Sequence, residues 1–202
     1  IMNRLLFRQR LNHLREDALR FQNTLCAYET TDAVRYPENF ERLSLDMARQ
    51  AESIACSTRN IVSIFQMNGR EQVQSCAAEA QGITVKEKSY GYEVILPHLM
   101  PKRNHRNHTV FLLEPLTYAL KEFTAAHPIC RLEYALIWFI YEYTEDTPIH
   151  CIRDYDNIET KEVLDIINSF FLLDDGGAFC ELHYSTRRGN RNGTRVIISS
   201  DI

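Results

Sequence analysis

The repeat of apolar side chains near the start of the chain is the feature that most restricts its fold. Spacings of four and three alternate at Phe7, Leu11, Leu14, Ala18, Phe21 and Leu25. Such a repeat is the seam of a heptad and predicts a helix that packs against a partner helix. After a polar break that ends at Pro37, a similar repeat follows at Phe40, Leu43, Met47, Ile54, Ile61 and Ile64. The sequence therefore predicts an antiparallel helical hairpin over residues 3–75, with the first seam buried against the second helix.

The rest of the chain has a different pattern, in which short strand-like runs alternate with amphipathic helices. The predicted elements are a β-hairpin over 83–97, a helix over 111–128, a buried strand over 131–144, a helix over 157–173, and strands over 178–188 and 194–200. The dipeptide Asn192-Gly193 predicts a hairpin turn between the last two strands. We therefore expect an α+β fold, in which a helical arm over 1–75 precedes an α/β sandwich over 84–202 with a mixed sheet and two helices.

Composition restricts the class of protein and its location. Of 202 residues, 45% are hydrophobic and 25% are charged, which is typical of a globular chain. The N-terminus has no signal-peptide pattern, and no apolar run is long enough to span a bilayer. We therefore expect a cytoplasmic protein with no membrane partner. The six cysteines are scattered and are expected to be reduced thiols.

The net charge of −4 argues against attraction of nucleic acid by the molecule as a whole. Two segments are nevertheless basic, and they are the expected DNA contacts if the chain binds the phosphate backbone. Residues 101–108 contain Lys102, Arg103 and Arg106, and residues 187–195 contain Arg187, Arg188, Arg191 and Arg195.

An acidic segment at residues 153–165, RDYDNIETKEVLD, is the main candidate for chemistry. Asp154 and Asp156 are two residues apart, so in an extended segment both side chains point to the same side. Asp174 and Asp175 follow the next predicted helix, and converging carboxylates of this kind suit Mg²⁺ or Mn²⁺. To share one ion, these carboxylates must lie within about 4–8 Å of one another.

A purely structural interpretation of the same residues is also open. Asp156 and Glu159 fit a capping box at a helix start. Lys161 and Asp165 fit a surface ion pair one helical turn apart. The segment Asp174-Asp175-Gly176-Gly177 fits an ordinary turn.

Residues 154–199 resemble the C-terminal half of the RusA family of Holliday junction (crossover junction) endodeoxyribonucleases. The matching positions are Asp154, Asp156, Asn157, Lys161, Asp165 and Asp174-Asp175. The resemblance covers roughly residues 88–199 and offers no counterpart for the helical hairpin. The chain also resembles an uncharacterised protein family of Firmicutes mobile elements.

The RusA resemblance implies a homodimeric, metal-dependent endonuclease that acts on branched, Holliday junction-like DNA in recombination, repair or mobile-element biology. In that role Asp154, Asp156 and Asp175 would be catalytic, and together with Asp174 they would hold Mg²⁺ or Mn²⁺. Lys161 would supply the catalytic cation, and the two basic segments would hold the DNA.

Lys161 departs from the family's pattern. It follows Asp156 by five positions, where the family has four, and one position turns a helical side chain by about 100°. This departure, the acidic net charge and the helical hairpin favour a second hypothesis, in which the chain is a catalytically inactive, RusA-like adaptor of a mobile element that binds DNA or protein.

Overall fold

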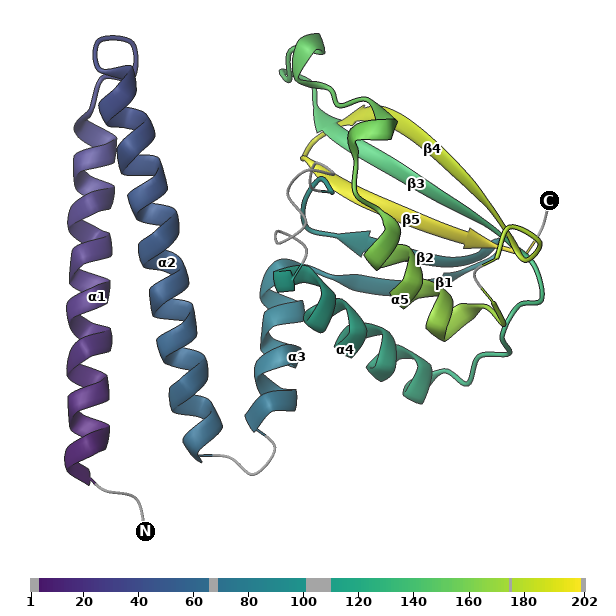
Figure 1. Cartoon of the computed structure of the whole chain (residues 1–202), viewed down its shortest axis with the longest axis horizontal. Helices are drawn as coiled ribbons and strands as arrows, with labels where there is room; N and C mark the ends of the chain where they lie inside the picture. The colour runs from purple at the N-terminus through teal and green to yellow at the C-terminus, as the bar shows by residue number, and fades with distance from the viewer. Residues whose placement is uncertain (1–3, 66–68, 101–109, 175, 201–202) are drawn as a thin grey trace. The chain divides into compact units, whose positions relative to one another are not determined.

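The chain has an α+β fold, as expected, with a helical N-terminal part and a five-stranded mixed sheet (Figure 1). The computed structural model describes residues 4–65, 69–100, 110–174 and 176–200. The helices are α1 Arg4–Thr30, α2 Pro37–Phe65, α3 Gly69–Gln81, α4 Val110–Ala126 and α5 Lys161–Phe171, with short 3₁₀ turns η2 Ile149–Cys151 and η3 Tyr155–Asn157. The strands are β1 Thr84–Lys88, β2 Gly91–Leu96, β3 Ala135–Thr144, β4 Cys180–Gly189 and β5 Gly193–Ser199.

The chain divides into two compact units, residues 1–73 and 74–202. We expect the arm over 1–75 and the domain over 84–202 to be separate folding units. Whether each part folds independently stays a prediction. Among the described residues, no helix is both long and apolar enough to cross a membrane.

In the first unit, α1 and α2 run antiparallel and are joined by a short polar turn (Figure 1). The Asp32 carboxylate accepts hydrogen bonds from the N–H groups of Val34 and Arg35, at 2.9 and 3.0 Å. Pro37 opens α2, where its missing N–H would have no helical partner in any case. Directly beside the turn, the rings of Tyr28 and Phe40 stack with centroids 4.2 Å apart. Side-chain capping and this aromatic pair therefore define the closed end of the hairpin.

The seam of α1 agrees with the predicted one at every second position. The less exposed residues of α1 are Phe7, Arg10, Leu14, Asp17, Phe21, Thr24 and Tyr28. The expectation is wrong for Leu11, Ala18 and Leu25, which are exposed. The heptad determines the period of the helix, but contact with α2 decides which of two adjacent stripes, the one with Leu11 or the one with Arg10, faces the partner helix. On the stripe that faces α2, Asp17 accepts a hydrogen bond from Ser53 across the hairpin at 3.4 Å. Among the described side chains of residues 7–62, none is fully buried.

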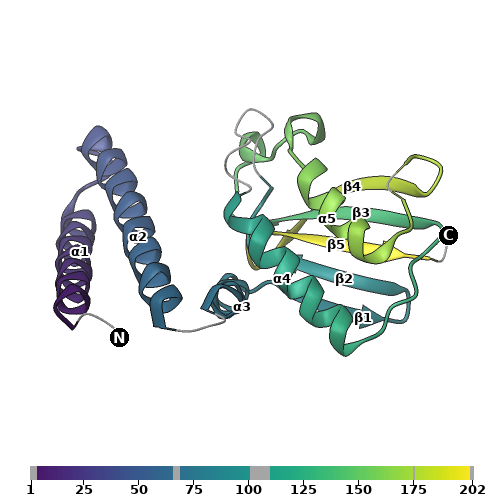
Figure 2. The same cartoon turned by 60° about the horizontal axis from the view of Figure 1, so that its bottom comes forward.

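The second unit is built on a sheet with the strand order β1-β2-β5-β3-β4. The pair β3–β4 is parallel and is connected through α5, whereas the other neighbouring strands are antiparallel. Both α4 and α5 cover the same face of the sheet (Figures 1 and 2). The core between sheet and helices contains Val94, Leu96, Ile137, Phe139, Tyr141, Val196, Ile198, Leu116, Leu120, Val163, Ile167 and Phe171.

Residues 69–83 are mostly polar, and they contain α3. Ala78 of α3 and Ile83 after it enter the core, which explains why a mostly polar segment is helical. Gly82, with φ of 70°, ends the helix, and the Ile83 N–H donates to the Ala78 carbonyl at 2.9 Å. The apolar content of the segment is too small for its helical period to stand out from the sequence.

The predicted hairpin between the last two strands is also wrong. β3 lies between β4 and β5, so the two strands are not neighbours. The favoured two-residue hairpin turn requires positive φ at both central residues, and neither Asn192 nor Gly193 has it. The Asn192 side chain instead accepts a hydrogen bond from the Thr144 N–H at the end of β3, at 3.1 Å. Asn192 therefore helps the chain to pass over β3 rather than to turn back along β4.

Gly91 is the glycine on which the β1–β2 turn most depends. Its φ is 130°, and a Cβ there would lie 2.1 Å from the Ile198 carbonyl oxygen. We expect Gly91→Ala to destabilise the second unit by about 2 kcal/mol or more, because the backbone is strained and a neighbouring strand must move. Urea unfolding followed by the fluorescence of Trp138, the single tryptophan, measures this unit directly. Gly189→Ala, where a Cβ meets nothing within 4 Å, should change the unfolding free energy by less than about 0.5 kcal/mol. Equal effects of both variants would contradict the proposed clash.

Candidate functional site

The acidic segment is attached to the carboxyl end of β3. The Arg153 N–H donates to the hydroxyl of Tyr143 at 3.1 Å, which places the following Asp154 beside the end of that strand. Tyr155 stacks between Tyr141 and Tyr184, with ring centroids 6.0 and 5.9 Å apart. This aromatic packing holds the segment against the helix-covered face of the sheet.

Asp154 and Asp156 do not form the extended pair that the spacing suggested. Asp154 is extended, but Asp156 lies inside the 3₁₀ turn η3, so the two-residue alternation of an extended chain does not apply. Both side chains are exposed. The two carboxylates therefore have no imposed common direction.

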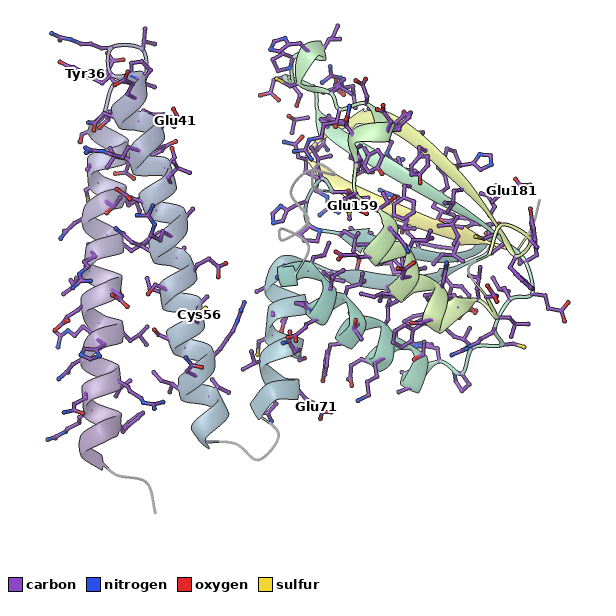
Figure 3. All side chains as sticks on the ribbon, in the orientation of Figure 1. Tyr36, Glu41, Cys56, Glu71, Glu159 and Glu181 are labelled. Atoms are coloured by element: carbon purple, nitrogen blue, oxygen red, sulfur yellow. The ribbon has the colours of Figure 1, made fainter. Side chains whose placement is uncertain are left out.

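Asp174 lies at the opposite end of the sheet from Asp154. The Leu173 N–H donates to the Leu132 carbonyl at 3.1 Å, so the residue before Asp174 pairs with chain that precedes β3. β3 has ten residues and spans roughly 30 Å at about 3.3 Å per residue. Figure 3 labels one residue toward each end of the sheet: Glu159, which precedes α5, lies toward the carboxyl end of β3, and Glu181 lies near the start of β4. The expected convergence of Asp154 and Asp156 with Asp174 on one ion is therefore wrong.

The structural interpretation accounts for most of these acids. The Asp174 carboxylate accepts the Gly176 N–H at 2.8 Å, as in an ordinary turn. Lys161 and Asp165 form an exposed ion pair one helical turn apart, at 3.8 Å. The capping box is wrong, because α5 begins at Lys161 with Thr160 at its N-cap and Asp156 does not cap it.

Asp175 lies outside the described residues, so its predicted roles in catalysis and metal binding stay predictions. Within the described ranges, no group of three or more histidine, cysteine, aspartate or glutamate side chains is placed to hold a metal ion.

The structure describes only the second of the two basic segments, residues 187–195. Lys102, Arg103 and Arg106 lie outside the described residues, and their expected DNA contacts stay predictions. Arg188 donates hydrogen bonds to the carbonyls of Thr144 and Thr147, at 2.9 and 2.6 Å, and so holds the turn after β3.

Arg187 and Arg195 also serve the fold. Arg187 pairs with Glu142, to which its Nε donates at 2.8 Å. Arg195 donates to Glu93 at 2.7 Å and to Glu142 at 3.0 Å. Arg187, Arg188 and Arg195 are therefore engaged in contacts within the fold, although Arg187, like Arg191, is exposed, and the expected DNA contacts of this segment stay predictions.

These pairs belong to a row of alternating charge that crosses every strand of the sheet. Its members, one per strand in the order β1-β2-β5-β3-β4, are Lys88, Glu93, Arg195, Glu142 and Arg187. We call this row the charged diagonal. Its two carboxylates are buried, with 4% of Glu93 and 8% of Glu142 exposed, while its cations reach solvent in part. Three cations and two anions leave a net charge of +1.

The charged diagonal lies on the face of the sheet opposite to α4 and α5. We call this the open face; among residues 74–202 as described, no helix lies over it (Figures 1 and 2). Beside the diagonal, Leu136 and Trp138 of β3 and Ile197 of β5 point to the same face. Trp138 is 38% exposed, and its indole N–H donates to Ser185 on β4 at 2.8 Å. The ring is therefore fixed in place while part of it faces solvent.

Glu142 is held ionised by its neighbours. Burial by itself raises the pKa of the Glu142 carboxyl, but hydrogen bonds from Arg187 and Arg195 and their positive charges outweigh burial and lower it. The open face thus combines a fixed aromatic ring with cations whose counter-charges lie beneath them.

The comparisons with known proteins identify one relationship. A family model described as a family of unknown function, DUF6100, matches residues 3–201. The chain belongs to this family. No curated protein and no solved structure matches it. The family match covers both units of this DUF6100 member, so the helical hairpin is part of the family's pattern and not an appendage.

Sequence reasoning did not single out Trp138 or Glu142. Both lie within the run predicted as a largely buried strand, where every residue of β3 except Thr144 is apolar, aromatic or Glu142. A glutamate inside such a run was the available signal, because a buried carboxylate requires a cationic partner. That signal points to the open face of this DUF6100 protein, although it does not name Arg187 and Arg195 as the partners.

Glu142 should control part of the acid stability of the second unit. Because its pKa is lowered by folding, its contribution is present above the unfolded pKa and is lost as pH falls through the folded one. We expect Glu142→Gln to destabilise the unit by about 1–3 kcal/mol at neutral pH and to reduce the loss of stability below roughly pH 4.5. Urea unfolding at several pH values, followed by Trp138 fluorescence, measures both effects. Glu145→Gln removes an exposed acid just after β3 and should leave both unchanged; equal behaviour of the two variants would contradict this role.

Proposed function

We propose that this protein is a non-catalytic nucleic-acid-binding module whose open face holds a single-stranded segment, of the kind that branched DNA exposes. The observation that carries the proposal is the exposed, hydrogen-bonded Trp138 beside the charged diagonal. Unstacked bases bind flat aromatic rings on sheet surfaces, and the backbone follows adjacent cations.

The register of the sheet supports this use of the face. Trp138 pairs with Ile197 on β5 and with His183 on β4, while Arg195 pairs with Ile140, two residues along β3. Diagonal neighbours in a sheet are about 7–8 Å apart. A base stacked on Trp138 would thus have a cation of the charged diagonal within reach of its backbone phosphate. Leu136 and Ile197 would extend the apolar floor on which the base lies.

The separation of the acids supports a module without catalysis. Phosphodiester cleavage by a metal mechanism needs carboxylates that share an ion, and Asp154 and Asp174 lie at opposite ends of the sheet. The net charge of −4 also agrees with modest, local binding rather than attraction by the whole molecule. The RusA-like endonuclease is accordingly the hypothesis that the test must exclude.

Trp138 makes the proposal directly measurable, because it is the only tryptophan. We expect an oligothymidylate of about 15 nucleotides to quench its fluorescence, with an affinity that falls as salt rises. Trp138→Ala should weaken binding, measured by anisotropy of a labelled oligonucleotide, by about 1–3 kcal/mol, whereas Trp138→Phe should retain most of it. Lys86 pairs with Glu93 and therefore lies on the open face at its β1 edge. Lys86→Ala should reduce the salt slope by about one.

Leu182→Ala is the matched control for loss of an exposed apolar side chain. Leu182 is 40% exposed but lies on the opposite face of β4, beside Ile137, so its replacement should not change binding. Fluorescence that oligonucleotides leave unchanged would refute a nucleic-acid role for the open face. Mg²⁺-dependent cleavage of branched DNA that disappears in Asp154→Asn would refute the non-catalytic assignment and restore the endonuclease.

A further inference from the structure

The helical hairpin has a second apolar stripe that α2 does not cover. Leu11, Ala18 and Leu25 are spaced by seven residues along α1, and Leu11 and Leu25 are 41% and 38% exposed. Because none of the described side chains of residues 7–62 is fully buried, the pair of helices has no closed core of its own. Two helices with so little burial need further apolar contact to be stable.

On the side of the hairpin that carries Leu11, Ala18 and Leu25, the residues in the middle of α2 have small side chains. The less exposed residues of α2 include Phe40, Leu43, Met47, Gln50, Ile54, Ser57 and Ile61, which define the direction of its seam. In an antiparallel pair, the positions that follow the seam by one residue lie on one side of both helices. On α1 these include Leu11, Ala18 and Leu25, which alternate with Arg8, Arg15, Gln22 and Glu29, and on α2 they include Ser44, Ala51 and Thr58. We call this side, on which the middle of α2 carries small side chains, the flat side.

The charges along the flat side are opposite at its two ends. Arg8 and Arg15 lie on α1 toward the open end of the hairpin, and both are exposed. Glu29 of α1 and Glu41 of α2 lie toward the turn, and both are also exposed. Figure 3 shows Glu41 near the closed end of the hairpin. The half of the surface with Arg8 and Arg15 is basic and the half toward the turn is acidic, with Leu11 and Leu25 on either side of Ala18, so this surface complements a copy of itself turned end over end.

The spacing about Ala18 gives this complementarity a definite register. Leu11 and Leu25 are each seven residues from Ala18, which is about 10.5 Å along a helix. Arg8 and Glu29 are ten and eleven residues away, or about 15 and 16.5 Å. A twofold axis at Ala18 therefore places Leu11 opposite the partner's Leu25 and Arg8 opposite the partner's Glu29. Alanine at the axis permits close approach of the two backbones.

We infer that the flat side is a self-association surface, through which two copies of the chain form an antiparallel four-helix bundle with α1 crossing the partner subunit's α1 at Ala18. The contact is isologous, so each interaction occurs twice. The opposite arrangement, with the two turns at the same end, brings Glu29 and Glu41 near the partner's acids and leaves the arginines together. Charge thus selects the end-over-end form.

The apolar part of this contact is tested by the concentration dependence of mass. Sedimentation velocity of the full chain should show a reversible species of twice the 23.6 kDa chain mass. Leu11→Gln with Leu25→Gln should raise the dimer dissociation constant roughly tenfold or more. Leu19→Gln with Leu45→Gln is the matched control, because these leucines are more exposed, at 52% and 60%, but lie off the flat side. A chain that stays monomeric at every concentration, or equal effects of both double variants, would overturn the proposal.

The register is tested by exchange of charge. Arg8→Glu alone and Glu29→Arg alone should each weaken the dimer, since each brings like charges together twice. The double variant should recover most of the wild-type dissociation constant, and the recovery should diminish at high salt. Circular dichroism of each variant shows whether the helices persist. Double-variant binding weaker than that of either single variant would overturn the end-over-end register.

Ala18 provides a test of the axis that does not depend on charge. Ala18→Lys should abolish the dimer, because two long cations would meet at the twofold. Ala27→Lys makes the same substitution at an exposed position off the flat side and should leave the dimer intact. A dimer that tolerates Ala18→Lys as well as Ala27→Lys would place the contact elsewhere on the chain and overturn the assignment.

Discussion

The charged diagonal is the interaction on which the second unit most depends. Glu93 and Glu142 are buried on the face of the sheet opposite to α4 and α5, and a buried carboxylate is stable only beside a cation. Arg195 contacts both acids, so the central strand β5 is tied to β2 on one side and to β3 on the other. Arg187 extends the tie to the edge strand β4. The strand order and the register of the sheet are thus the ones in which each carboxylate has an arginine.

The same requirement explains why the basic segment at the end of the chain is not a free DNA-binding loop. Arg187 and Arg195, on strands of the sheet, pair with buried acids on neighbouring strands, whereas Arg191, beyond the strand end, is exposed. Yet the cations of the diagonal still reach the surface, because their carboxylates lie beneath them. Structural ion pairs and a weakly cationic surface are therefore compatible, and Trp138 lies beside both.

The acidic segment illustrates how acids that lie close along the sequence can be far apart in space. Its acids occupy both ends of a βαβ unit, and the crossover helix α5 connects those ends rather than bringing them together. In a parallel pair of strands, residues before the crossover helix lie at the carboxyl edge, and residues after it lie at the amino edge. Lys161 pairs with Asp165 on its own helix.

The sequence by itself determined the helical hairpin, the alternation of strands and helices after it, and the α+β class, because period and turn residues are local properties. Only the tertiary structure decided which stripe of α1 faces α2, since Leu11 and Arg10 both fit the heptad and the partner helix selects between them. It also decided that β3 separates β4 from β5, because strand order depends on contacts between distant residues such as Glu142 and Arg195. The same holds for the acids. Their spacing along the chain was visible from the start, but whether they share one end of a sheet depends on the direction of every strand between them.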